Sequence, residues 1–143
     1  MKRVMLGTLA IVAGAIASIP AFVKANDLER DEVLFLLYLV GACVFASPVV
    51  LLRLVAGWPA RTLLASAGLA GLVPVILAGA WYHLLAQGYA PRDEEALLLP
   101  LLVGPVTGVL VALGSVLSLG LAEVIRWIGG ARGASGNAVR HRK

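Results

Sequence analysis

The stretch ALLLPLLVGPVTGVLVALGSVLSLGLA, from Ala96 to Ala122, contains no charged residue. About twenty apolar residues, each rising roughly 1.5 Å, allow a helix to cross a hydrocarbon core about 30 Å thick. This stretch exceeds that length and leaves some residues for tilt. It therefore predicts a transmembrane helix at about residues 97–121.

Small residues recur within this predicted helix at every fourth position. Gly104, Gly108 and Ala112 share one face, along which another helix can approach closely. The first apolar segment of the chain has a similar face, which consists of Ala10, Gly14 and Ser18. We expect both faces to pack against other transmembrane helices.

Three further uncharged segments lie at about residues 4–23, 33–52 and 62–85, and each is long enough to span a membrane. The first also resembles a signal peptide, because Val23 and Ala25 fit a cleavage site after Ala25. Its apolar body is longer than that of a signal peptide, which usually has roughly 7 to 15 residues, and this favours an uncleaved span. The sequence thus predicts an all-α integral membrane protein with four transmembrane helices in two helical hairpins, contained in residues 1–128.

The composition agrees with a membrane protein and excludes a soluble globular domain. Hydrophobic residues make up 60% of the chain and charged residues 14%, and the mean hydropathy is +0.93. A soluble domain of this composition would be coated with apolar surface. The net charge of +4 does not indicate a nucleic-acid partner, because the basic residues lie at the ends of apolar segments rather than among aromatic residues. The expected surroundings are a lipid bilayer.

The positive charges also predict the orientation of the chain. Three cations fall on the side of the two acidic connections, namely Lys24, Arg30 and Arg92. The larger group falls on the other side and consists of Lys2, Arg3, Arg53, Arg61, Arg126, Arg132, Arg140, Arg142 and Lys143. The positive-inside rule therefore places both termini in the cytoplasm. The short connections and the high content of Ala, Leu, Gly and Arg favour a bacterial inner membrane, and the glycine-rich basic tail at 129–143 is expected to be disordered.

Several polar and aromatic residues are predicted at the membrane interfaces. Tryptophan and tyrosine are favoured at this depth, because they combine an apolar ring with a polar group. Glu123 and Arg126 are three residues apart and are expected to pair where the last helix ends. The full set of interfacial candidates is Trp58, Trp81, Tyr82, His83, Glu123, Arg126 and Trp127.

The sequence offers little material for catalysis. Cys43 is the only cysteine, and no second His or Cys stands at ligand spacing from His83. The chain has no nucleophile beside a base and no phosphate-binding loop, so we expect neither an enzyme nor a metal or cofactor site. Thr107, Ser115 and Ser118 either line a polar path or bond to carbonyl groups of neighbouring turns.

Two classes of function remain. The first is a non-catalytic accessory or assembly subunit that packs against the helices of other membrane proteins. The second is a homo-oligomer that forms a pathway for an ion or a small solute. A further hypothesis concerns the origin of the two hairpins: ERDEVLFLLYLVG, residues 29–41, resembles PRDEEALLLPLLVG, residues 91–104, as expected for a parallel duplication.

Overall fold

The computed structural model describes residues 1–26, 31–88 and 94–140, and this part of the chain forms four α-helices. They are α1 (Lys2–Asn26), α2 (Asp31–Leu54), α3 (Ala60–Ala86) and α4 (Glu94–Arg140). Four segments of these helices are long and apolar enough to cross a membrane, namely Lys2–Asn26, Val33–Leu54, Ala60–Ala86 and Pro100–Gly129. The predicted all-α fold with four transmembrane helices is confirmed, and the chain is a multi-pass membrane protein.

The helices end where glycine and proline dictate. Gly57, between α2 and α3, has φ = +63°, and Pro59 directly precedes the first residue of α3. Gly88, with φ = +84°, follows α3 and donates its N–H to the carbonyl oxygen of Leu85 at 3.0 Å. A left-handed glycine with such a hydrogen bond is the usual way to end a helix.

Helix α4 extends past the predicted end of the fourth span. It continues through Gly129 to Arg140. The tail predicted to be disordered is therefore helical over residues 129–140 in this structure, and residues 141–143 lie outside the described residues. Most of the two acidic connections, residues 27–30 and 89–93, also lies outside them.

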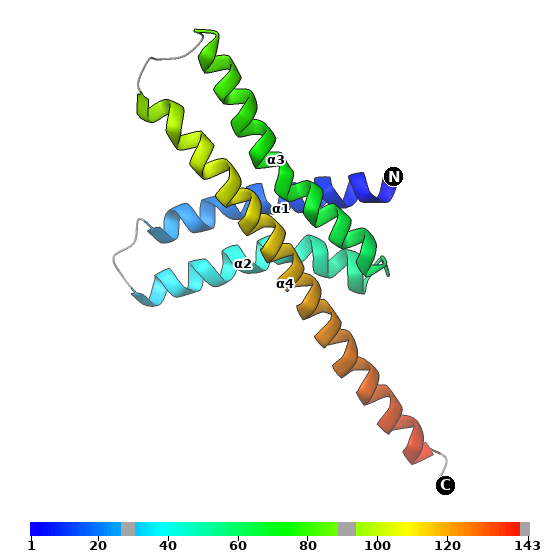
Figure 1. The fold of residues 1–143 in the computed structure, drawn as a ribbon. Helices are drawn as coiled ribbons and strands as arrows, with labels where there is room; N and C mark the ends of the chain where they lie inside the picture. Colours follow the sequence, from blue (N-terminus) through cyan, green and yellow to red (C-terminus); the bar gives the residue numbers. More distant parts are fainter. Residues whose placement is uncertain (27–30, 89–93, 141–143) are drawn as a thin grey trace.

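The four helices form two antiparallel hairpins that cross obliquely (Figure 1). Helix α1 packs on α2 within the first hairpin, and α3 packs on α4 within the second. Between the hairpins, α1 packs on α3 and α2 packs on α4, whereas α2 and α3 have few contacts. The duplication of the two hairpins stays a hypothesis.

The core lies where the hairpins cross. Bulky residues are concentrated on the outside of the bundle, as expected for helices surrounded by lipid: Leu102 and Leu113 are 68% and 56% exposed. Small side chains dominate several of the inner contacts. The buried core consists of Ile11, Val49, Leu63, Ala67, Ala70, Val111 and Leu119, with Phe45, Leu52 and Trp58 packed against it.

Candidate functional site

The glycine face of α4 packs against α3 of the same chain. A Cβ atom added to Gly71 would lie 2.8 Å from the carbonyl oxygen of Gly108 and 3.1 Å from Cβ of Ala112. A Cβ atom added to Gly104 would meet Cβ of Ala78 and, at 3.0 Å, the carbonyl oxygen of Pro74. The face formed by Gly104, Gly108 and Ala112 therefore packs on α3 within the second hairpin.

The packing face of α1 includes two of the three residues of its predicted small-residue face. Gly14 and Ser18 are buried, but Ala10 lies at the edge of the contact, and Gly7 and Ile11 are buried in its place. Pro48 of α2 fits against Gly14, where an added Cβ atom would lie 2.7 Å from the proline Cγ. A seven-residue spacing, Gly7 to Gly14 and Ile11 to Ser18, marks this face in the sequence.

One polar contact between the hairpins joins α1 and α3, near the end of the bundle where both helices begin. The hydroxyl group of Ser66 is fully buried and lies 2.9 Å from the carbonyl oxygen of Thr62 and 3.0 Å from that of Val4 in α1. Thr8 donates to the same Val4 carbonyl group at 2.9 Å. An added Cβ atom on Gly7 would collide with Ser66 Oγ, so the glycine is what lets the serine reach α1.

A second polar contact between the hairpins joins α2 and α4 at the same end. Arg53 Nε lies 2.5 Å from Glu123 Oε1, and Arg53 Nη1 donates to the carbonyl oxygen of Trp58 at 2.8 Å. The ion pair of Glu123 is therefore with Arg53 of another helix, rather than with Arg126 three residues further along α4. Sequence spacing indicates only partners on the same helix, which is why Arg53 was missed.

The aromatic interfacial candidates fall into two groups. Trp81, Tyr82 and Trp127 are exposed, as an interfacial position requires. His83 is also exposed and lies 2.9 Å from Gln87 through its Nε2 atom. Trp58, in contrast, is half-buried against the core, and its ring lies beside Gly7. Trp58 thus packs the α2–α3 turn onto α1, whereas the sequence predicts only that it lies at the membrane interface.

A large apolar cavity lies between the two hairpins at the middle depth of the helices. Its volume is about 930 Å³, and residues of all four helices line it. The cavity opens to the surroundings of the bundle. In a membrane it must therefore be filled by an apolar group.

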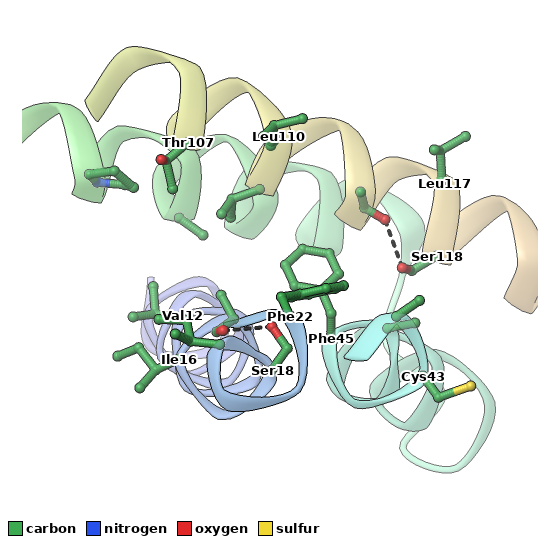
Figure 2. Close-up of a pocket in the computed structure, with 18 of the residues that line it drawn as sticks. Val12, Ile16, Ser18, Phe22, Cys43, Phe45, Thr107, Leu110, Leu117 and Ser118 are labelled. Atoms are coloured by element: carbon green, nitrogen blue, oxygen red, sulfur yellow. Dashed lines mark hydrogen bonds between the residues drawn. The ribbon is translucent and has the colours of Figure 1, made fainter. Parts of the chain in front are cut away.

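Two of the hydroxyl groups that line the cavity are bonded to carbonyl oxygens of their own helices. Ser18 donates to the carbonyl oxygen of Ala15 at 2.7 Å, and Ser118 donates to that of Gly114 at 2.7 Å (Figure 2). Ser115 is buried away from the cavity and donates to Val111 at 2.7 Å. Of the three candidates for a polar pathway, Thr107 and Ser118 line the cavity and Ser115 does not. A polar path through these three residues stays a prediction.

Comparisons with protein families, with curated proteins and with solved structures find no match to this chain. Within residues 1–26, 31–88 and 94–140, no group of three or more His, Cys, Asp or Glu side chains is placed to hold a metal ion. The features that can be interpreted in terms of function are thus the cavity and the outer faces of the helices.

Proposed function

We propose that this chain is a non-catalytic accessory or assembly subunit of a bacterial inner membrane, and that it binds a transmembrane helix of another membrane protein through the outer face of α2. The observation that carries this proposal is the low burial of α2. In its apolar segment 11% of the residues are buried, compared with 33% in α3 and in α4. Helix α2 is thus the transmembrane helix that the rest of the chain covers least.

The outer face of α2 has the spacing of a helix-packing surface. Its residues follow one another at steps of three and four, which places them in one stripe along the helix. Small side chains lie in the middle of the stripe, and the hydroxyl group of Ser47 there is bonded to the carbonyl oxygen of Val44 at 2.8 Å. The exposed residues of this α2 stripe are Leu36, Val40, Cys43, Ser47, Leu51 and Leu54.

A protein partner fits this stripe better than lipid alone. Association of helices in a membrane depends on close packing, which small residues permit, because lipid tails are as apolar as leucine. The glycine faces of α1 and α4 are used inside the chain, whereas the small residues of the α2 stripe stay exposed.

Purification of the tagged chain from its native membrane in a mild detergent tests the proposal. We expect a second membrane protein to copurify in a fixed ratio, and we expect Val40→Trp to release it by filling the α2 stripe. Val109→Trp is the matched control, because Val109 is exposed on α4 outside the stripe. A particle that contains several copies of this chain and no other protein would instead favour the homo-oligomeric transporter or channel.

The proposed location includes both termini in the cytoplasm. Single cysteines in a Cys43→Ala background test this orientation, with Ala56→Cys in the α2–α3 turn and Gln87→Cys at the end of α3. We expect a membrane-impermeant maleimide added to intact cells to label Gln87→Cys, and to label Ala56→Cys after the cells are opened. The reverse pattern would place the termini on the outer side.

A further inference from the structure

Three cations from the two hairpins lie together at one end of the bundle. The hydroxyl group of Ser66 in α3 lies 3.0 Å from the carbonyl oxygen of Val4 in α1 and 2.9 Å from that of Thr62, so it bridges the first turns of the two helices. Figure 1 shows the start of α1 beside the turn that leads into α3. The exposed cations of these two turns, which we call the basic cluster, are Lys2, Arg3 and Arg61.

The described part of the chain offers the basic cluster no carboxylate partner. Glu123, the acidic residue nearest to this end within residues 1–26, 31–88 and 94–140, is paired with Arg53. The other acidic residues of those ranges stand at the starts of α2 and α4, at the opposite end of the antiparallel hairpins, and they are Asp31, Glu32, Glu94 and Glu95. Like charges gathered at one place attract a counterion. The basic cluster therefore favours an anionic ligand.

An apolar surface begins directly beside the basic cluster. Met5 and Leu6 in α1 are 62% and 58% exposed, and Leu64 in α3 is 46% exposed. The apolar segments Lys2–Asn26 and Ala60–Ala86 both start here, so the cluster lies where the hydrocarbon core meets the headgroups. An acidic phospholipid matches both features, because its phosphate group is anionic and its acyl chains cover apolar side chains. An acidic peptide would match the cations alone.

We propose that the basic cluster binds the phosphate group of an acidic phospholipid, which thereby joins α1 of the first hairpin to α3 of the second. The headgroup neutralises cations that otherwise repel one another, and the acyl chains lie on the outer faces of the two helices. No residue of the basic cluster belongs to the α2 stripe. This proposal and the accessory-subunit proposal can therefore fail independently.

Trp58 is placed to report on this site, because its ring lies beside Gly7, one helical turn after Arg3. The test uses the full chain with Trp81→Phe and Trp127→Phe, which leave Trp58 as the single tryptophan. The vesicles consist of phosphatidylcholine with a small fraction of phosphatidylglycerol, and one of the two lipids carries bromine near the headgroup end of its acyl chains. We expect brominated phosphatidylglycerol to quench the Trp58 fluorescence severalfold more than the same fraction of brominated phosphatidylcholine. Equal quenching by the two lipids would overturn the proposal.

Variants of the basic cluster measure its contribution to this preference. Arg3→Gln and Arg61→Gln are each expected to lower the preference for phosphatidylglycerol about fivefold, as the loss of one cation near an anionic lipid surface predicts. Arg61→Lys keeps the charge and should retain most of the preference, even if Arg61→Gln fails to fold. Lys24→Gln is the matched control, because Lys24 is exposed at the other end of α1. It should leave the preference unchanged.

Arg126→Gln separates a defined site from the general positive charge of this end of the protein. Arg126 is exposed on α4, outside the basic cluster. We expect Arg126→Gln to retain the preference for phosphatidylglycerol. A loss equal to that of Arg61→Gln would show that the whole charged end attracts acidic lipid, and it would overturn the proposal.

Sodium phosphate and sodium chloride at equal ionic strength identify the source of the phosphate group. An equal preference for phosphatidylglycerol in the two salts supports a lipid headgroup as the ligand. A preference that is lost in sodium phosphate alone would show that a free anion occupies the basic cluster, and the proposal would be wrong.

Discussion

Gly108→Ala is expected to destabilise the protein strongly for so small a change. The glycine carbonyl groups of Gly71 and Gly108 each lie against the other helix, and a Cβ atom on Gly108 would collide with the carbonyl oxygen of Gly71 and lie 3.2 Å from Cγ2 of Val75. Since carbon atoms do not approach a backbone oxygen so closely, α3 and α4 must move apart. Of the glycines at which α3 and α4 touch, Gly108 lies closest to the facing helix.

The magnitude follows from the overlap of the added atom with the facing helix. Overpacking of a well-packed contact costs about 1–3 kcal/mol. We therefore expect Gly108→Ala to lower the free energy of unfolding by about 1–3 kcal/mol.

Reversible unfolding in mixed micelles, with helix content followed by circular dichroism, measures this difference. Gly120→Ala on the same helix is the control, because an added Cβ atom there would have open space around it. The control should be neutral or stabilising by up to about 1 kcal/mol, since alanine favours a helix over glycine. If Gly108→Ala lost no more stability than Gly120→Ala, the glycine contact would not hold the second hairpin together.

Two further predictions concern the contacts between the hairpins. Ser66→Ala should lower the free energy of unfolding by about 0.5–2 kcal/mol, because it removes the buried hydroxyl group between α3 and α1. In the same unfolding assay, Ser47→Ala on the exposed face of α2 should change the free energy of unfolding by less than about 0.5 kcal/mol. Arg53→Gln and Glu123→Gln should each lower the midpoint temperature of thermal unfolding, and the double variant should lower it by less than the sum of the two single changes. If the two changes were strictly additive, the ion pair would not couple α2 to α4.

Much of the fold could be predicted from the sequence because a transmembrane helix appears there as one continuous run of about twenty apolar residues. Each observed helix contains its predicted span, and Gly57, Pro59 and Gly88 mark the ends of helices as their chemistry requires. The end of α4 was less predictable. Polar residues after Gly129 signal the end of the apolar span, but they do not by themselves stop a helix.

The partners of individual residues were harder to predict. The small face of Gly104 and Gly108 was evident from its spacing, but spacing does not tell whether the neighbouring helix belongs to the same chain. The ion pair of Arg53 with Glu123 joins residues 70 positions apart in the sequence, and no local pattern relates them. The cavity was also invisible, because it results from the angle at which two hairpins cross rather than from any one segment.

The order in which the helices contact one another has a consequence for the way the protein is made. Helices α1 and α2 complete their mutual packing, with Pro48 against Gly14, before any of α3 needs to be synthesised. Arg53, at the end of α2, meets its carboxylate partner only when Glu123 arrives on the last helix. Until then the membrane holds a half-protein with an arginine lacking that counterion. Translation of α4 thus completes assembly, and a chain that stops short of it has an open glycine face on α3 and an arginine without its carboxylate partner.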